Sequence, residues 1–229
     1  MLVLDIVYPR RCVLCGELLL PGKPPVFSLC SACRSSLKRI TAENRCTICS
    51  RPLVSETDLC MDCRKRSFSF NKNVSVFHYQ DEIKELIYRY KFKFKLDLAH
   101  LFAEELFSVY TATFGDIPLV PVPSAKDTVR RRGFDHMGYI TALIKKKYNI
   151  GTFPLLKKHK TAPQKTLDPE RRLSNLHGKI ELKRSKTPFP KAVVLVDDVF
   201  TTGSTLSVCA SVLIRVGISP VFCITLALD

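Results

Sequence analysis

Beyond residue 70 the apolar positions follow two alternating periods, one typical of strands and one typical of helices. Residues 74–79 (VSVFHY) alternate apolar and polar side chains, as a half-buried strand does. Apolar residues then recur at helical spacing over 83–90, behind an expected cap at Asp81, and again over 98–109 after Asp97. This part of the chain predicts one strand followed by two amphipathic helices.

The same alternation continues toward the end of the chain. Residues 117–123 (IPLVPVP) are typical of a buried strand that ends at prolines, and an amphipathic segment over 137–144 follows. The continuous aliphatic run 192–196 (AVVLV) is of the kind that a parallel sheet buries on both faces. A helical pattern over 204–216 and a last apolar strand over 221–228 complete the series. Strands and helices alternate, so the predicted fold class is α/β with a parallel sheet.

The first 63 residues follow neither period and hold four C-x-x-C pairs instead. Two such pairs complete the tetrahedral four-thiolate shell that Zn²⁺ favours and leave no position open for water. We therefore predict a double zinc ribbon domain over residues 1–70 with two structural zinc sites, and a second domain over 71–229. Sequential pairing of neighbouring C-x-x-C turns is preferred, and interleaved pairing is the alternative. The metal-ligating candidates are Cys12, Cys15, Cys30, Cys33, Cys46, Cys49, Cys60 and Cys63.

Composition and charge narrow the expected surroundings and partners. The 229 residues are 46% hydrophobic, which suffices for a packed core, and the chain shows no signal peptide and no apolar run long enough to cross a membrane. Paired cysteines of this kind favour a reducing compartment, so we expect a cytoplasmic protein without membrane insertion. The net charge is +15, and residues 71–191 alone carry +12. This excess predicts a polyanionic partner or substrate.

The stretch VVLVDDVFTTGST (193–205) joins two carboxylates to a run of hydroxyls around one glycine. A parallel strand that ends in Asp197 and Asp198 brings both carboxylates to the carboxyl edge of the sheet, where open α/β folds bind ligands. Backbone amides over 201–205 then begin a helix, which suits a phosphate. A ribose 5-phosphate, with vicinal hydroxyls or hydrated Mg²⁺ at the aspartates, satisfies both ends. The alternative is a capped helix beside two solvated aspartates.

This stretch closely resembles the phosphoribosyl pyrophosphate (PRPP) motif of type I phosphoribosyltransferases. The whole chain resembles the ComF family, because the paired cysteines, VPVPSAKDTVRRRGFDH, TAPQKTLDPERRLSN and the PRPP motif occur in the family's order. The family commonly has Gly-Phe-Asn-Gln after its arginines, whereas this chain has Gly-Phe-Asp-His, ending at His136.

The resemblance implies a type I phosphoribosyltransferase-like sheet with helices on both faces, preceded by the Cys-rich double zinc ribbon. It implies that Asp197 and Asp198, the candidate catalytic residues, hold the ribose hydroxyls of Mg²⁺-bound PRPP, and that the loop after residue 123 meets the pyrophosphate. The residues implied around the 5-phosphate are Thr201, Thr202, Gly203, Ser204 and Thr205.

Three basic segments offer further anion sites. Arg130, Arg131 and Arg132 are expected to project from a loop toward pyrophosphate or a nucleic-acid backbone, with a solvated basic loop as the alternative. Residues 157–172 predict a long mobile loop, either a lid over pyrophosphate or an ordinary surface loop. The stretch YRYKFKF (88–94) alternates rings and cations as a single-strand binding surface does, but inward packing of its rings is preferred.

Three functions follow from these patterns. The first, taken from the family, is a PRPP-binding phosphoribosyltransferase-like protein that supports DNA uptake in natural transformation. The second is a single-stranded-DNA adaptor whose PRPP site is regulatory or vestigial, and the third is a salvage phosphoribosyltransferase with an unidentified acceptor. Catalysis would be mainly charge stabilisation, since the five histidines are scattered singly and are expected to be structural or exposed. The sequence leaves open whether the site turns PRPP over or only senses it.

Overall fold

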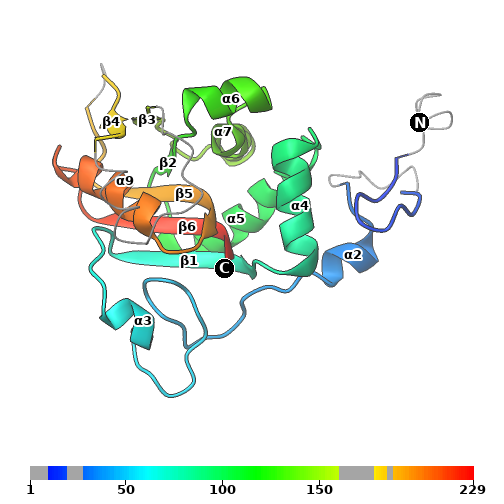
Figure 1. The fold of residues 1–229 in the computed structure, drawn as a ribbon, viewed down its shortest axis with the longest axis horizontal. Coiled ribbons are helices and arrows are strands. Elements are labelled where there is room, and N and C mark those ends of the chain that lie inside the picture. Colours follow the sequence, from blue (N-terminus) through cyan, green and yellow to red (C-terminus); the bar gives the residue numbers. More distant parts are fainter. Residues whose placement is uncertain (1–9, 20–27, 160–177, 185–187) are drawn as a thin grey trace.

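A four-stranded parallel sheet lies at the centre of the molecule (Figure 1). The computed structural model describes residues 10–19, 28–159, 178–184 and 188–229. The strand order is β1-β6-β5-β2, and each neighbouring pair is parallel. The α/β fold class predicted from the alternating patterns is thereby confirmed. The strands are β1 (Lys72–His78), β2 (Leu119–Pro121), β5 (Val193–Phe200) and β6 (Val221–Leu228).

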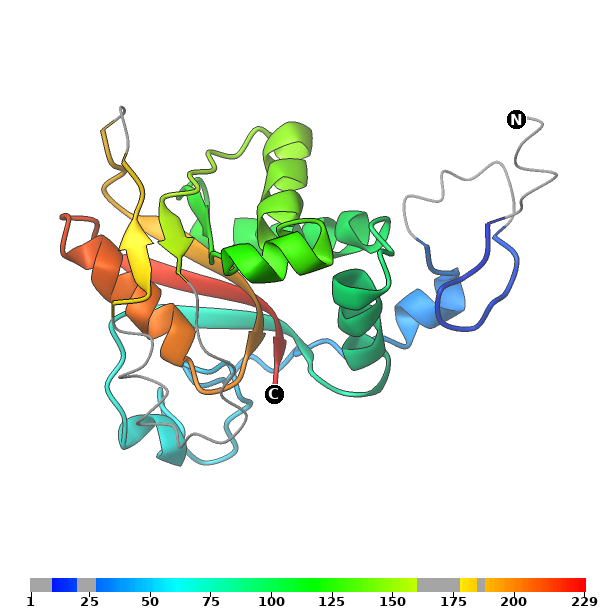
Figure 2. The ribbon, with the colours of Figure 1, turned by 45° about the horizontal axis from the view of Figure 1, so that its top comes forward.

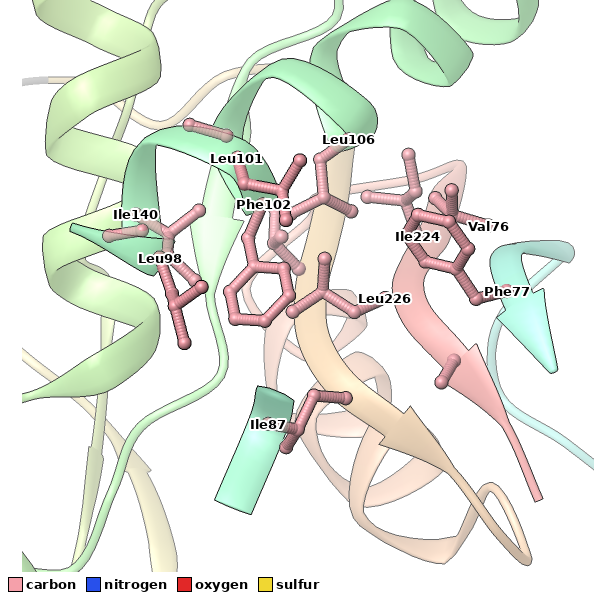
Figure 3. Close-up of a cluster of buried hydrophobic side chains, with 14 of the residues drawn as sticks. Val76, Phe77, Ile87, Leu98, Leu101, Phe102, Leu106, Ile140, Ile224 and Leu226 are labelled. Carbon is pink, nitrogen blue, oxygen red and sulfur yellow. The ribbon is translucent and has the colours of Figure 1, made fainter. Parts of the chain in front are cut away.

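One face of the sheet is covered by three helices. Side chains alternate along a strand, so Val194 and Val196 of β5 face these helices while their neighbours face the other way. Figure 3 shows Phe102 and Leu106 packed beside Leu226 of β6, and all three side chains are buried. Burial of large apolar side chains here provides most of the driving force for this layer. The helices are α4 (Asp81–Phe92), α5 (Leu98–Phe114) and α7 (His136–Tyr148).

The opposite face is covered by α9 (Ser204–Ile214) and a small antiparallel sheet of β3 (Leu156–Lys158) and β4 (Ile180–Leu182). Val193 and Leu195 of β5 pack into this second cluster. The two cysteines outside the C-x-x-C pairs, Cys209 and Cys223, are fully buried in the same cluster, as expected for packing residues. Burial raises the pKa of both thiols, so they stay neutral.

The two Cys-rich ribbons pack against different parts of this sheet and do not stack on each other in the described part of the chain. The first ribbon, with α2 (Ser31–Ser35), adds Cys12, Leu29 and Leu37 to the helical cluster. The second, with α3 (Met61–Arg64), adds its four cysteines to the α9 cluster. Figures 1 and 2 show α2 and α3 on opposite sides of the molecule. Each ribbon therefore extends one of the two cores.

Both edges of the sheet are covered by chain segments. The segment between the ribbons pairs with β1, where the Ile40 amide donates to the Val76 carbonyl at 2.9 Å and the His78 amide donates to the Lys38 carbonyl at 3.1 Å. At β2, the Leu119 amide donates to the carbonyl of Gly151 at 2.8 Å. Backbone groups that would form open edges are thus paired at these positions.

The structure corrects three local expectations. Arg130, Arg131 and Arg132 form the last turn of a short helix, α6 (Lys126–Arg132), instead of projecting from a loop. Asp81 is the first residue of α4 and makes no capping bond, because Gln80 occupies the cap position. Of the loop expected over 157–172, Lys157 and Lys158 instead belong to β3, and residues 160–172 lie outside the described residues. Among the helices that the structure describes, none has the length and apolar character to span a membrane.

The carboxylate of Glu105 on α5 joins the first ribbon and the following segment to the core, and its substitution is expected to destabilise the fold. It is 7% exposed and accepts from Arg39 (Nε at 3.0 Å, Nη2 at 2.7 Å) and from Arg34 (Nη2 at 3.2 Å). Glu105→Gln leaves these arginines without this charge partner and should lower the free energy of unfolding by about 1–3 kcal/mol, since both arginines are partly exposed.

The neighbouring Glu104 provides the matched control for this prediction. Its side chain is 22% exposed and pairs with Lys147, which is itself half exposed. It also lies 3.5 Å from Nη2 of Arg34, but it makes no contact with Arg39 among the described interactions, so it shares only the weaker of the two arginine contacts of Glu105. Glu104→Gln should cost less than about 1 kcal/mol. Urea unfolding followed by circular dichroism measures both variants. Equal losses in the two would show that Glu105 is not the anchoring group.

Candidate functional site

The eight paired cysteines form two separate four-thiol clusters. In each cluster the sulfur atoms lie within 4.8 Å of one another. The clusters are Cys12, Cys15, Cys30 and Cys33, and Cys46, Cys49, Cys60 and Cys63. The neighbouring C-x-x-C turns are therefore brought together, as the preferred sequential pairing predicted.

The sulfur distances fit tetrahedral zinc. The Sγ atoms of Cys15 and Cys30 are 3.7 Å apart, and those of Cys49 and Cys60 are also 3.7 Å apart. Tetrahedral Zn–S bonds of about 2.3 Å place neighbouring sulfurs about 3.8 Å from each other. All four positions of each shell are thiols, so both sites suit a structural metal.

The electrostatics of the thiols also call for a cation. Burial opposes ionisation of Cys12, but backbone N–H groups donate to its sulfur and lower its pKa to about 6. The same balance lowers the pKa of Cys46 to about 7. Burial and the neighbouring sulfurs raise the pKa of Cys49 to about 12, and that of Cys63 further. Four thiolates can coexist there only when a divalent cation offsets their charge.

At the carboxyl edge of the central sheet, Asp198 is held between a lysine and a histidine from two helices. Its Oδ2 atom lies 2.5 Å from Nζ of Lys91 on α4 and 2.5 Å from Nε2 of His136, the first residue of α7. The Asp198 side chain is 14% exposed. Burial opposes its ionisation, but Lys91 and His136 outweigh that effect and hold its pKa well below the usual range. Asp198 is therefore a carboxylate at neutral pH.

The other nitrogen of His136 is held by the basic helix and the loop after β2. Nη1 of Arg132 lies 2.8 Å from Nδ1 of His136, and Oγ of Ser124 lies 3.1 Å from the same atom. A guanidinium can only donate, so Nδ1 accepts and Nε2 carries the proton that is donated to Asp198. The Arg132 Nε atom is buried and has no acceptor among the described residues. Burial lowers the pKa of Arg132 from its ordinary value.

Asp197 differs from its neighbour in having no salt bridge among the described residues. Its Oδ1 accepts from the backbone amide of Asp198 at 2.9 Å. Burial and the negative charge of Asp198 raise the pKa of Asp197 to about 7. One ligand atom each from Asp197, Asp198 and His136 lies within 4.8 Å of the others. The pair thus offers one carboxylate bound by Lys91 and His136 and one with no salt bridge to a described residue.

The hydroxyl-rich loop that follows β5 turns sharply at Gly203. This residue has φ of +71°, and a Cβ there would meet the Phe200 ring at 2.8 Å, so only glycine fits without displacement. Oγ1 of Thr202 and Oγ of Ser204 are 2.9 Å apart at the start of α9. The loop therefore presents the hydroxyls and the helix N-terminus that the sequence predicted.

The second ribbon contacts the same loop from the other side. Nη2 of Arg66 donates to the Thr202 carbonyl at 2.7 Å, and the Ser69 amide donates to Oγ of Ser207 at 3.0 Å. A cavity of about 360 Å³ lies between the two parts, with Arg66 and Thr202 on its wall. The phosphate-type loop is thus supported by residues at the end of the zinc ribbon.

The structure brings together only some of the residues expected at the site. Asp197, Asp198, Arg132 and the loop 201–205 lie at one edge of the sheet, whereas Arg130 and Arg131 are exposed and make no salt bridge with another described residue. His136, which was expected to be structural or exposed, is buried and holds Asp198 at the site, a contact that the sequence did not predict. The only sequence signal was its place at the end of Gly-Phe-Asp-His, where the family commonly has glutamine.

The rings of the stretch 88–94 were expected to pack inward, and most of them do not. Tyr90 is buried as predicted, but Tyr88, Phe92 and Phe94 are 45%, 51% and 62% exposed. Inward packing is therefore wrong for three of the four rings. Lys91 from the same stretch reaches Asp198, an interaction that the alternation of rings and cations did not reveal.

Comparison with known proteins agrees with the motifs. Residues 3–64 match the family model of the double zinc ribbon domain. Competence protein ComFC from Bacillus subtilis is 29% identical over 201 residues, which cover 84% of this chain and 80% of that protein. Competence protein F from Haemophilus influenzae is 29% identical over 92% of this chain and 93% of its own length. DNA utilization protein YhgH from Escherichia coli is 25% identical over 94% and 96%.

Among solved structures, a hypoxanthine phosphoribosyltransferase from Staphylococcus aureus aligns with 57% of this chain and 63% of its own. The sequence identity is 15% and the TM-score is 0.35. The curated relatives confirm the resemblance to the ComF family over most of the chain. The structural neighbour adds no argument about activity.

Zinc stoichiometry in double variants tests the ligand pairing. Cys12→Ser with Cys30→Ser removes two ligands from one cluster, so one zinc per chain should remain. Cys12→Ser with Cys46→Ser damages both clusters and should leave no tightly bound zinc. Metal analysis of the purified proteins by inductively coupled plasma mass spectrometry measures both. Interleaved pairing predicts no tightly bound zinc in the first double variant and one zinc per chain in the second.

Asp197→Asn should stabilise the protein above neutral pH. The folded pKa of Asp197, about 7, lies above its ordinary value of 3.8, so the folded state retains a proton between these pH values and stability falls as pH rises through 7. The variant removes that penalty. Its free energy of unfolding should exceed that of the wild type by roughly 1–2 kcal/mol at pH 8, after allowance for partial solvent screening.

The pH dependence separates this effect from a general change in packing. The difference between variant and wild type should shrink toward pH 4, where Asp197 is protonated in the folded protein. Thermal unfolding at a series of pH values without added Mg²⁺ gives the comparison. A difference that is the same at pH 5 and pH 8 would refute the raised pKa.

Proposed function

Because this chain is homologous to ComF-type competence proteins over most of its length, we propose that it is a PRPP-binding, phosphoribosyltransferase-like protein that supports DNA uptake. Residues 71–229 would form the PRPP-binding domain and residues 1–70 the zinc ribbon domain. The names of the relatives refer to competence and DNA utilization. The role in DNA uptake therefore rests on homology, and the ligand rests on the site.

The observation that carries the ligand assignment is the convergence at the carboxyl edge of the sheet. The acidic pair at the end of β5, the hydroxyl-rich loop 201–205 and Arg132 occur within one continuous edge. A ribose 5-phosphate would place its phosphate on the loop and its hydroxyls at Asp197 and Asp198. The loop after β2, with Ser124, would then meet the pyrophosphate.

Two unmet interactions in the site support a charged ligand. The buried Nε of Arg132 lacks an acceptor among the described residues, which is costly unless a ligand oxygen supplies one. Burial and the negative charge of Asp198 raise the pKa of Asp197, and Mg²⁺ bound with PRPP would favour its ionised form. Carboxylate oxygens are ligands that Mg²⁺ prefers, so the residues fit the metal. Bound Mg²⁺ would offset the charge of departing pyrophosphate.

The protein's own groups suit charge stabilisation more than proton transfer. Lys91 and His136 hold Asp198 ionised, so that this carboxylate can accept from ribose hydroxyls or face developing positive charge at the sugar. Ser124, His136 and Asp198 are hydrogen-bonded in series, but Arg132 donates to the same Nδ1 atom of His136 that would have to accept a proton from Ser124. Activation of Ser124 as a nucleophile is therefore disfavoured. Transfer to an acceptor base and sensing of PRPP both remain within this proposal.

In its DNA-uptake role the protein would contact single-stranded DNA or the uptake machinery. The net charge of +15 favours a polyanionic partner. We also propose a cytoplasmic location, since eight zinc-binding thiols are maintained most readily in a reducing compartment.

Calorimetric titration of Mg²⁺-PRPP tests the ligand. Asp197→Asn combined with Asp198→Asn should weaken binding about tenfold or more, because both acceptors for the ribose hydroxyls lose their charge. Asp116→Asn, which alters an exposed carboxylate before β2, should bind as the wild type does. Unchanged affinity in the double variant would sink the assignment. Pyrophosphate release with a panel of bases then separates transfer from sensing.

Arg132→Gln should distinguish the two ends of the ligand. If Arg132 meets the pyrophosphate, the variant should lose about tenfold in affinity for PRPP and much less for ribose 5-phosphate, which lacks that group. Arg130→Gln, on the exposed side of α6, is the matched control and should change neither. Equal losses for both ligands would place Arg132 elsewhere in the site.

A further inference from the structure

Three aromatic side chains around the end of α4 are exposed without a packing role that explains them. Tyr88, Phe92 and Phe94 are 45%, 51% and 62% exposed, although large rings are usually buried. The rings of Tyr88 and Phe92 have centroids 5.3 Å apart, so they form one surface along the helix. Isolated exposed apolar residues are common on protein surfaces, but these rings form a contiguous exposed patch.

The rings continue onto the basic helix α6. The guanidinium of Arg132 lies 5.2 Å from the centre of the Phe92 ring, and a Cβ on Gly133 would come within 3.1 Å of the Phe94 ring. Phe94 in turn lies beside Phe134, with centroids 6.4 Å apart. The α4–α6 surface, as we call it, therefore consists of Tyr88, residues 92–95 and residues 130–134. Figure 2 shows the two helices side by side.

Exposed cations are interleaved with these rings. Lys93, Lys95, Arg130 and Arg131 are all exposed, and none forms a salt bridge with another residue that the structure describes. The ammonium of Lys93 lies 6.0 Å from the centre of the Tyr88 ring. A surface that alternates exposed rings with exposed cations suits a flexible polyanion that carries planar groups.

We propose that the α4–α6 surface binds single-stranded nucleic acid, with bases stacked on Tyr88, Phe92 and Phe94 and phosphates held by the flanking lysines and arginines. A duplex hides the faces of its bases, so its rings cannot stack in this way, and only its backbone would contact the cations. An anionic membrane surface would use the cations but would give no preference for unpaired bases.

This proposal can be tested separately from the PRPP assignment, because Asp197 and Asp198 are not part of the α4–α6 surface. On α4, Lys91 reaches Asp198 while Phe92 on the next position is exposed. Only Arg132 lies at both places, against the Phe92 ring and against His136. Loss of binding at one site can therefore be separated from loss at the other.

Fluorescence anisotropy of a labelled oligothymidylate titrated with the full zinc-loaded chain tests the surface. Tyr88→Ala, Phe92→Ala and Phe94→Ala should each lower affinity about fivefold or more, as expected for loss of one stacked base. Phe92→Leu keeps an apolar side chain but removes the ring, and it should lose affinity similarly. Phe189→Ala, an exposed ring outside the surface, should have no effect.

The salt dependence tests the interactions with phosphate. Lys93→Gln with Lys95→Gln should reduce the slope of log affinity against log salt by about 0.7 for each phosphate that the variant no longer neutralises. Lys145→Gln with Lys146→Gln, exposed on the last turn of α7, is the matched control and should leave the slope unchanged. A proportionate reduction of the slope in this control would mean that general charge, and not the surface, binds DNA.

Two further results would overturn the proposal. The first is unchanged affinity in the triple aromatic variant with intact zinc content and circular dichroism. The second is a duplex of the same length binding as tightly as the single strand. Asp197→Asn with Asp198→Asn should retain oligothymidylate binding, so that a failed PRPP assignment leaves this result intact.

Discussion

A short parallel sheet has two apolar faces and two edges, and all four must be covered before the sheet is stable in water. Here β5 and β6 send alternate side chains into two separate clusters, one beneath α4, α5 and α7 and one beneath α9. Each zinc ribbon extends one cluster, and the segment that joins the ribbons pairs with β1. The ribbons are therefore part of how the sheet is closed and are not appended modules.

The same arrangement determines the chemistry at the carboxyl edge. Asp198 follows Val194 and Val196 on the side of the helices, so Lys91 of α4 and His136 of α7 reach it from two elements. On the far side, Arg66 at the end of the second ribbon contacts the Thr202 carbonyl. Burial makes a lone carboxylate costly, and Lys91 and His136 allow Asp198 to remain ionised there.

The sequence predicted those features of the structure that depend on local periodicity and on motif spacing. The strands near residues 72, 119, 193 and 221, the zinc clusters and the hydroxyl-rich loop all follow from patterns within a few residues. Interactions between elements far apart in the chain could not be foreseen, because no period links Lys91, His136 and Asp198. The exposure of the Phe92 and Phe94 rings was missed for a related reason. Helical spacing shows which residues share one face of a helix, but it does not show whether another element covers that face.

The pairing of residues 38–40 with β1 has a consequence for the protein's solubility. That segment is anchored on both sides by clusters whose thiols need a metal to adopt their shape. A chain that loses zinc would release the segment and leave β1 with unpaired backbone groups along its outer side. Such a strand can pair with the same strand of another molecule, so zinc depletion would promote dimers joined at this edge of the sheet.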